Sequence, residues 1–533
     1  MCEPALKPPK PSKAPPVEGD GRCRFFVAKK NRYCPFATKS NSKYCGEHMV
    51  GKQSNLLDAN ANVPNTRVPC PYDPSHSVDL HKLKRHMAAL CNARPPEIWP
   101  TYTAPDCNVA LLPPGYTHDS FEEAGALWKE EGLGKADPRL MLKPGDLTYM
   151  SATSRVFSDW APPEASTSQK HEKQPLDRQS VERLLKPVVL SYLRSVEELS
   201  AESDAEQCSL SELLIRVRCS EEFPTDVRSH SALDHKRLIK ANQKHAQQQA
   251  SIVGHLEKRG LLDSKYAFIE FGSGKGELSV YVHAAVVAAN PDTAPDSRVY
   301  LVDRKVFRQK FKVDQQDNGA RKTQDHQDSS QQLERINIDI RDFDLASLEG
   351  LRATDPLTGN PVLRPIIAYS KHLCGGATDL TLKCLERYQQ AGGHIAGVAI
   401  ALCCHHACRY SMYVDHEYLS TAVASHSTES RQWSHDQRSD FRHLASMTGW
   451  AINLPPPVSP GSAFEKDSEP AHYSGLSYAQ RVCAGHAVKR FLDIGRVRFV
   501  RRQLGMDDAE LVYYTLRTTS PENLALFATD LKH

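Results

Sequence analysis

The stretch FIEFGSGKGELS, residues 268–279, decides the fold class of this 533-residue chain. An apolar run with Glu270 in its middle leads into a turn that carries Gly272, Gly274 and Gly276, and helical sequence follows. Glycine permits a tight turn and lets the backbone approach a ligand closely. A strand, a glycine-rich turn and a helix in this order indicate the ligand-binding unit of an α/β fold.

Four further apolar runs follow this stretch and alternate with helical sequence. They are RVYLVD (298–303), RINIDI (335–340), PIIAYS (365–370) and GVAIALC (397–403). Nearly continuous apolar runs suit parallel strands that are buried on both faces. The segments VRFVR (497–501) and LVYYTLR (511–517) predict a closing antiparallel pair of strands. The whole pattern predicts an α/β doubly wound sheet.

The glycine spacing argues against a dinucleotide site. In the fingerprint G-x-G-x-x-G the third glycine comes one residue later, where this chain has Glu277. An acid two residues before the first glycine, here Glu270, instead resembles the motif of class I S-adenosylmethionine methyltransferases. Asp303 ends the next strand, where an acid can bind both ribose hydroxyls of a nucleoside. The alternative is a glycine-rich turn without a ligand. The predicted donor-binding residues are Glu270, Gly272, Gly274, Gly276, Asp303 and Asp339.

Two metal-ligand patterns occupy the first hundred residues. The first set is Cys23, Cys34, Cys45 and His48, spaced C-x10-C-x10-C-x2-H. The second set is Cys70, His76, His86 and Cys91, spaced C-x5-H-x9-H-x4-C. Four nitrogen and sulfur ligands suit tetrahedral zinc, so we predict two zinc ions. The first segment has too few apolar residues to fold alone, and metal would supply its folding energy. The alternative is a scatter of thiols and imidazoles.

Composition indicates a soluble globular protein with a formal net charge of +3. No run of eighteen apolar residues is present, so we expect no membrane span. The N-terminal text MCEPALKPPKPSKAPP is basic and proline-rich and has no signal-peptide core. The 15 cysteines are therefore expected to be thiols and metal ligands. We expect an intracellular protein of the cytoplasm, the nucleus or both, not a secreted one. The sequence gives no sign of an obligate protein partner.

Basic residues cluster in two places although the overall charge is nearly balanced. Residues 21–52 hold eight lysines and arginines against Glu47 alone. Residues 489–502 hold six against Asp493 alone. The six are Lys489, Arg490, Arg496, Arg498, Arg501 and Arg502. Such clusters favour a polyanionic partner such as nucleic acid, and the alternative is a solvated surface balanced by acids elsewhere in the fold.

Two motifs rich in chemistry follow the fourth and fifth predicted strands. SKHLCGGATD (370–379) and ALCCHHAC (401–408) would both open at the carboxyl edge of the sheet, where α/β folds bind ligands. Their side chains could bind zinc, form a buried structural cluster, or position substrate and move protons. Because neighbouring residues on a strand face opposite ways, Cys403 and Cys404 are not expected to chelate together.

These motifs together resemble one family, the eukaryotic tRNA 2′-O-ribose methyltransferases that modify the fourth nucleotide, in the acceptor stem. The resemblance covers residues 21–530 apart from insertions. It is carried by the paired fingers, YTAPDCN (102–108), EFGSGKGELS (270–279), LVDR (301–304), SKHLCGGATDLTL (370–382), ALCCHHAC (401–408), VKRFLDIGR (488–496) and SPEN (520–523). It implies a class I, Rossmann-like methyltransferase domain, S-adenosylmethionine as methyl donor and tRNA as substrate.

The implied reaction needs the sulfonium methyl aligned with a ribose 2′-hydroxyl and a group that accepts the hydroxyl proton. Lys371, His372 and His405 are the candidate catalytic residues, and the sequence does not choose between Lys371 and His405 as the base. Two alternatives remain open at this point. The chain could be an RNA-binding zinc-finger protein with a degenerate methyltransferase domain, or a methyltransferase that acts on a base or on protein.

The predicted domain order follows from these assignments. A basic tail (1–20) precedes a CCCH finger (21–52), a CHHC finger (66–95), a linker and helical region (96–258) and the methyltransferase domain (259–533), with insertions near 315–332 and 454–472. Within the helical region, HKRLIKANQKHAQQQASIVGHLEKRG (235–260) predicts one long polar helix.

Overall fold

A computed structural model of the chain describes parts of it, separated by gaps. The described residues are 21–27, 32–34, 37–38, 67–69, 77–79, 82–87, 100–104, 106–110, 176–196, 207–219, 222–234, 243–293, 297–304, 333–355, 358–423, 435–452 and 472–531. The tail at 1–20 and the predicted insertion at 315–332 lie outside them, as does all but the last residue of the insertion at 454–472.

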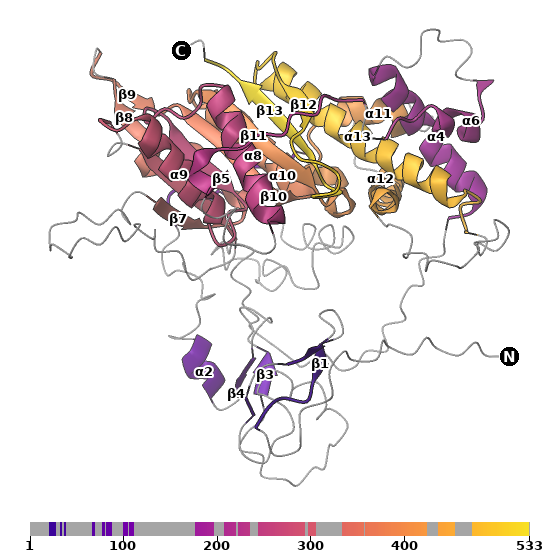
Figure 1. Cartoon of the computed structure of the whole chain (residues 1–533), viewed down its shortest axis with the longest axis horizontal. Helices are drawn as coiled ribbons and strands as arrows, with labels where there is room; N and C mark the ends of the chain where they lie inside the picture. The colour runs from indigo at the N-terminus through magenta and orange to yellow at the C-terminus, as the bar shows by residue number, and fades with distance from the viewer. Residues whose placement is uncertain are drawn as a thin grey trace.

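A seven-stranded sheet organises the large body of the molecule (Figure 1). Its strand order is β12-β13-β11-β10-β5-β6-β7. The strands are β5 (Ala267–Phe271), β6 (Arg298–Asp303), β7 (Leu333–Asn337), β10 (Ile366–Cys374), β11 (Ile395–Cys403), β12 (Glu510–Tyr513) and β13 (Leu524–Thr529). The first five named are mutually parallel, and β13 is antiparallel to both of its neighbours. The five predicted parallel strands are therefore confirmed.

The predicted closing pair is right in kind and wrong in one member. VRFVR lies inside helix α13 (Tyr478–Gln503), and β12 pairs instead with β13. The helix begins at Ser477, whose side chain and that of Gln480 form a capping box. Apolar side chains of α13 such as Val497 and Val500 are buried, so a helix satisfies this run as well as a strand would.

The order of the strands creates a ligand-binding edge. The chain runs outward from β5 to β6 and β7, then returns to place β10 on the other side of β5. Ligands of open α/β sheets bind outside the carboxyl ends of the strands at such a reversal. The glycine turn after β5 and the motifs that end β10 and β11 all lie at this edge.

Helices cover both faces of the sheet. They are α8 (Lys244–Lys258), α9 (Glu277–Ala289), α10 (Gly376–Gln390) and α13. In β5, Ile269 and Phe271 pack in a core with α10 and α13, whereas Phe268 faces a core with α8 and α9. This alternation makes a three-layer α/β arrangement.

Helix α8 confirms a helix within the predicted stretch 235–260, but it is buried on several sides despite its polar sequence. It begins at Lys244, and residues 235–242 lie outside the described parts. Ile252, Val253 and Leu256 pack against the sheet, and His255 is also buried. Gln248 and Gln249 are buried as well, so the polarity of the sequence does not predict that this helix packs in the core.

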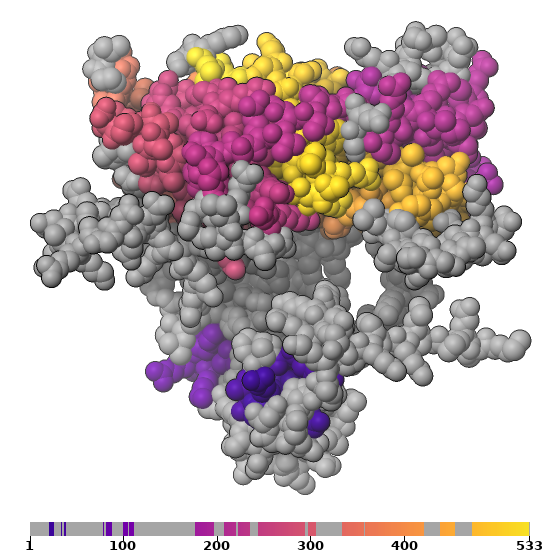
Figure 2. Space-filling model, in the orientation of Figure 1, coloured from indigo at the N-terminus to yellow at the C-terminus, as the bar shows by residue number. Residues whose placement is uncertain are grey.

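A second group of helices packs around the N-terminal half of α13. It consists of α4 (Arg178–Ser195), α6 (Leu210–Ile215), α11 (His416–Val423) and α12 (His435–Met447). Leu185 and Tyr192 of α4 share one apolar core with Val488 and Phe491 of α13. In the space-filling view these early and late segments form one continuous body (Figure 2).

Short hairpins make up the described N-terminal parts. They are β1 (Phe26–Val27) with β2 (Arg32–Tyr33) and β3 (Arg67–Pro69) with β4 (Ser77–Asp79), followed by α2 (Leu83–Arg85). A further hairpin, β8 (Arg352–Thr354) with β9 (Pro361–Leu363), precedes β10. Among the described helices, none has the length and apolar character to cross a membrane.

Candidate functional site

The three glycines of the turn after β5 all adopt positive φ, each for a different reason. A Cβ on Gly276 would lie 2.2 Å from Leu301 Cδ2, so the packing of β6 excludes a side chain there. At Gly272 it would lie 3.3 Å from the His372 carbonyl oxygen, which shows how closely β10 approaches the turn. At Gly274, with φ of 54°, nothing lies within 4 Å. Gly274 therefore presents bare backbone to open space.

Glu270 fastens this turn from inside the protein. Its Oε2 accepts hydrogen bonds from the backbone nitrogen and the hydroxyl of Ser279, at 3.1 and 2.5 Å. The Ser279 hydroxyl in turn contacts Tyr369 Oη at 2.7 Å. Burial raises the pKa of Glu270 to about 7, against the lowering effect of these hydrogen bonds. The donor role of Glu270 stays a prediction, and the contact that the structure shows is with Ser279 at the start of α9.

Asp303 lies beside the open glycine. Its Oδ2 accepts a hydrogen bond of 2.8 Å from Gly274 N. Arg335, on β7, donates to the Gly274 carbonyl at 2.8 Å, so neighbouring strands hold the turn from both of its backbone groups. A carboxylate at this strand end can bind the hydroxyls of a ribose. The sequence prediction missed Arg335, which is hidden in an apolar run.

Asp339 forms the start of the next loop along this edge. Its Oδ1 accepts from Arg341 N at 3.0 Å and so caps the short 3-10 helix η9 (Ile340–Asp342). The side chain is half-buried. The structure therefore places Asp339 near the end of β7, in the strand-end loops, as the donor-site prediction requires, and gives it a local structural role as well.

A distant segment, YTAPDCN, packs against this loop. Asn108 Nδ2 donates to the carbonyls of Ile340 and Phe343 at 2.6 and 2.8 Å. Buried Asp106 lies 3.3 Å from Arg341 Nε. These contacts join positions more than 230 residues apart, so periodicity and spacing give no sign of them.

Lys371 and His372 end up together on the open edge, with a partner that the sequence did not predict. Lys371 Nζ lies 3.3 Å from Nδ1 of His245, at the start of α8. The rings of His245 and His372 meet edge to face with centroids 5.8 Å apart. His372 is exposed as a residue, but the enclosure of its ring, and then the charge of Lys371, lower its pKa.

His405 lies elsewhere, sealed inside the protein. Its Nε2 is 2.7 Å from Asp493 Oδ1, and both side chains are fully buried. Burial lowers the pKa of His405, although Asp493 opposes this. Such a neutral imidazole would donate its Nε2 hydrogen to Asp493. The catalytic role of His405 stays a prediction, and its burial favours the structural alternative.

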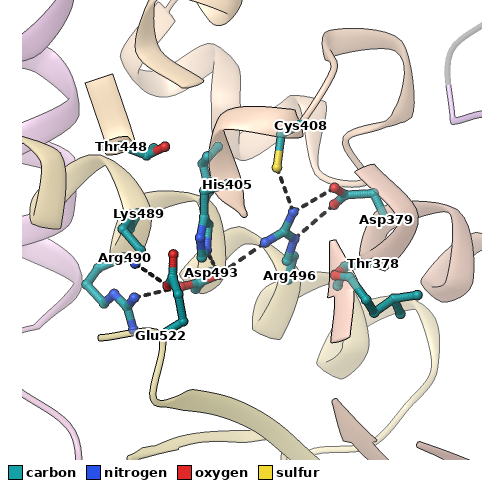
Figure 3. Close-up of polar contacts among 12 residues, drawn as sticks. Thr378, Asp379, His405, Cys408, Thr448, Lys489, Arg490, Asp493, Arg496 and Glu522 are labelled. Carbon is teal, nitrogen blue, oxygen red and sulfur yellow. Dashed lines mark hydrogen bonds and ion pairs between the residues drawn. The ribbon is translucent and has the colours of Figure 1, made fainter. Parts of the chain in front are cut away.

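A buried ion network surrounds His405 (Figure 3). Arg496 makes a two-pronged contact with Asp379, with Nε to Oδ1 at 3.0 Å and Nη2 to Oδ2 at 2.7 Å. Arg496 also reaches Asp493 Oδ1 at 3.1 Å and Cys408 Sγ at 3.1 Å. Burial raises the pKa of Asp493, but the hydrogen bond from His405 and the charges of Arg490 and Arg496 outweigh it and hold that pKa well below its usual range.

The predicted basic patch at 489–502 is therefore wrong. Lys489, Arg490 and Arg496 are 0–3% exposed and pair with Glu522, Asp493 and Asp379. The three remaining cations have protein partners too. Arg498 contacts Asp415, Arg502 contacts Glu417, and Arg501 donates to the Ala509 carbonyl. The six cations therefore do not form one exposed patch. The first three are buried in ion pairs, whereas Arg498 is partly exposed and Arg501 and Arg502 are exposed beside protein partners.

The strand-end thiols contradict a second expectation. Cys404 does not continue β11 but turns back with φ of 50°, so the alternation of a strand ends at Cys403. The sulfur atoms of Cys374, Cys403 and Cys404 all lie within 4.8 Å of one another. The motif ALCCHHAC is thus divided between an open thiol cluster and the sealed network.

The structure describes three of the eight predicted zinc ligands. Cys23 and Cys34 are buried at the two sides of the β1–β2 hairpin, where Cys34 N donates to the Phe25 carbonyl at 2.9 Å. His86 follows α2 directly. The other five, Cys45, His48, Cys70, His76 and Cys91, lie outside the described residues.

A mostly parallel α/β sheet has a glycine turn at its reversal point and an acid at the next strand end, which is the place where open α/β sheets bind their ligands. The family described as methyltransferase TRM13 matches residues 247–529, and the chain belongs to this family. Residues 21–49 match the CCCH zinc finger in TRM13 protein, and residues 67–89 match the U11-48K-like CHHC zinc finger. The second match ends before Cys91.

Curated relatives match nearly the whole chain. The "tRNA:m(4)X modification enzyme TRM13" of Eremothecium gossypii is 30% identical over 95% of both chains. The proteins of the same name from Schizosaccharomyces pombe and Saccharomyces cerevisiae are 28% and 25% identical, over 87% and 98% of this chain and 95% and 98% of their own. No solved structure matches the chain.

Proposed function

We propose that this chain is an S-adenosylmethionine-dependent tRNA 2′-O-ribose methyltransferase that acts on the fourth nucleotide of the acceptor stem. The observation that carries the proposal is the open backbone at Gly274 beside the Asp303 carboxylate, at the reversal point of the sheet. The relatives named as tRNA:m(4)X modification enzymes support the substrate and the position. The seven-stranded order, with one antiparallel strand, β13, near the edge, supports a class I, Rossmann-like domain.

The residues present fit the methyl donor. Gly274 leaves room for a ligand against its backbone, whereas a side chain would fill that space. Asp303 would accept hydrogen bonds from the ribose hydroxyls of the donor, and the Asp339 loop would line its other side. When bound, S-adenosylmethionine supplies an already activated methyl group on a sulfonium.

The protein's own chemical task is then small. It must hold the ribose oxygen in line with the methyl carbon, and it must accept the hydroxyl proton. Lys371 and His372 lie near the end of β10, the strand beside β5 and its glycine turn, so they are the residues proposed to position the ribose and take its proton. His405 is sealed away from that edge, and the network around it would keep the end of β11 in place.

The N-terminal fingers would supply RNA contacts. Residues 21–52 carry the other basic cluster, whereas half of the cations in the α13 cluster are buried in ion pairs. Phosphate contacts by such a segment would make tRNA affinity fall steeply with salt. The two finger matches support one zinc ion in each finger.

Labelled methyl transfer to bulk tRNA tests the proposal. The full chain is incubated with methyl-labelled donor and tRNA, and the labelled nucleotide is mapped after nuclease digestion. The proposal expects a 2′-O-methyl group on the fourth nucleotide, and less of it with Asp303→Ala when the donor is below saturation. Label in a base or in protein would favour the other enzymatic alternatives. Absence of donor binding in calorimetric titration would favour an RNA-binding protein with a degenerate domain.

A further inference from the structure

The carboxyl ends of β10 and β11 bring cysteines together through their pairing. Cys374 and Cys403 are register partners on adjacent parallel strands, so their side chains lie on the same face of the sheet. The register shifts between Ser370 and Leu373, and this irregularity brings Cys374 level with Cys403. Their sulfur atoms are 3.6 Å apart.

Cys404 adds a third sulfur through an unusual backbone. Among the described residues, Asp106 and Cys404 alone have positive φ without being glycine. A left-handed conformation at a bulky residue persists where the surrounding structure imposes it, and such residues concentrate at functional sites. Here it reverses the chain, so the Cys404 side chain returns toward the two strand ends instead of pointing away.

Gly375 holds the two strand ends close to each other. Its nitrogen donates to the Cys403 carbonyl at 3.2 Å. A Cβ at Gly375 would lie 2.6 Å from the backbone carbonyl carbon of Ala407, so no side chain fits between the loops. The compact loop pair fixes the three sulfurs before any ligand arrives, which lowers the cost of ordering them on binding.

The spacing of these sulfurs suits a tetrahedral thiolate site. Zinc–sulfur bonds of about 2.3 Å place two sulfur ligands about 3.8 Å apart in a tetrahedron. The Cys374–Cys403 distance of 3.6 Å is close to this value, and all three atoms fall within 4.8 Å of one another. A disulfide between Cys374 and Cys403 would not involve Cys404, so it would not account for the positive φ that brings the third sulfur to the cluster.

We infer that Cys374, Cys403 and Cys404 bind a zinc-class metal ion, separate from the two fingers. Three protein ligands with a fourth position open to water or to an oxygen ligand are typical of catalytic zinc sites, whereas structural sites have four protein ligands. Cys374 is exposed, Cys403 is buried and Cys404 is intermediate, so the ion would have a solvent-facing side. The site joins the end of the strand that carries Lys371 and His372 to the end of β11.

Metal content of the full chain tests this inference without any measurement of activity. Cys374→Ser and Cys404→Ser should each hold one metal ion fewer per chain than the wild type, by elemental analysis of zinc-supplemented preparations. The matched control is Cys219→Ser, because Cys219 and Cys483 form a two-thiol pair, at 4.0 Å, without a third metal-ligating side chain among the residues that the structure describes. It should keep the wild-type count. Equal counts in all four proteins would overturn the inference.

A second measurement covers the case in which the variants do not fold. In the wild type, a chelator should speed alkylation of Cys374, followed by peptide mapping, because a metal-bound thiolate reacts slowly. Alkylation of Cys208, outside the cluster, should be unaffected. A Cys374 rate that ignores the chelator would overturn the inference. So would a Cys374–Cys403 disulfide in protein purified without reductant, which would identify a redox pair instead.

Discussion

Two charged regions meet at the ends of β10 and β11, and they differ in their access to solvent. On the open edge, Lys371, His372 and Cys374 lie at the end of β10, whose backbone approaches a glycine turn that faces open space at Gly274. Just past the end of β11, His405 belongs to a network with Asp493 and Arg496 that is 0–1% exposed. Both regions look catalytic in a list of residue types. Only the residues of the open region are accessible to a substrate. The difference in burial therefore separates candidate catalytic side chains from side chains that stabilise the fold.

The largest expected effect on stability comes from the sealed region. Arg496→Ala would leave buried Asp379 without its ion-pair partner and would remove one of the partners of Asp493, and breaking a buried ion pair in this way costs about 3–5 kcal/mol. Arg502→Ala, on the same helix, removes an exposed pair with Glu417 and should cost at most about 1 kcal/mol. Urea unfolding of both variants measures the difference. A loss below about 1 kcal/mol for Arg496→Ala would remove the distinction.

A second prediction concerns a sealed imidazole on the other face of the sheet. His255 donates from Nε2 to the Asp226 carbonyl and accepts at Nδ1 from Arg259. Burial lowers the pKa of His255 to about 4. His255 binds a proton near pH 6.5 in the unfolded chain, but only near pH 4 in the folded chain. Stability should therefore fall as pH drops through this window, by up to about 1.4 kcal/mol per pH unit.

Unfolding of His255→Gln across the same pH range isolates this contribution. The variant should be less stable at pH 7, but its stability should depend less steeply on pH than that of the wild type. The exposed His406 supplies the control, since His406→Gln should leave the slope unchanged. An unchanged slope in His255→Gln would show that the buried ring titrates as it does in water.

The open edge can be tested through ligand affinity instead of stability. Gly274→Val should fill the space above the turn and abolish donor binding, and Asp303→Ala should weaken it roughly 10- to 150-fold by removing a charged hydrogen-bond acceptor. Gly392 is the matched control, because it has φ of 88° and nothing within 4 Å but lies before the amino end of β11. Gly392→Val should strain the backbone similarly and keep donor affinity. Calorimetric titration with S-adenosylmethionine measures these affinities. Unchanged donor binding by Gly274→Val would contradict the proposed donor site.

Much of the fold follows from local sequence. Five parallel strands were predictable because each is a nearly continuous apolar run of ordinary strand length. The packing of Gly276 against Leu301 was not, because the contact joins the turn after β5 to the neighbouring strand β6. VRFVR misled because a short apolar run does not distinguish a strand from a buried helix. Helix α8 misled because it buries glutamines, which polarity assigns to the surface.

The candidate site was less predictable, for reasons of long-range contact. The sequence places Lys371 and His372 at a strand end, but it gives no sign of His245, which arrives from a helix 126 residues earlier. The charges of α13 looked like a nucleic-acid patch because Asp379 and Glu522, their partners, are distant in sequence. The approach of Cys404 to Cys403 was not predicted, because its positive φ breaks the strand alternation on which the expectation rested.

One measurement tests the division between the two regions most directly: single-turnover methyl transfer on pre-bound tRNA, compared with melting curves of the same preparations. Lys371→Ala and His372→Ala should melt near the wild type, and at least one should lose about 100- to 10,000-fold in rate. His405→Ala should melt at a lower temperature, since it removes a buried hydrogen bond, yet transfer methyl groups near the wild-type rate where it is folded. A folded His405→Ala protein without activity, beside two active strand-end variants, would contradict the account.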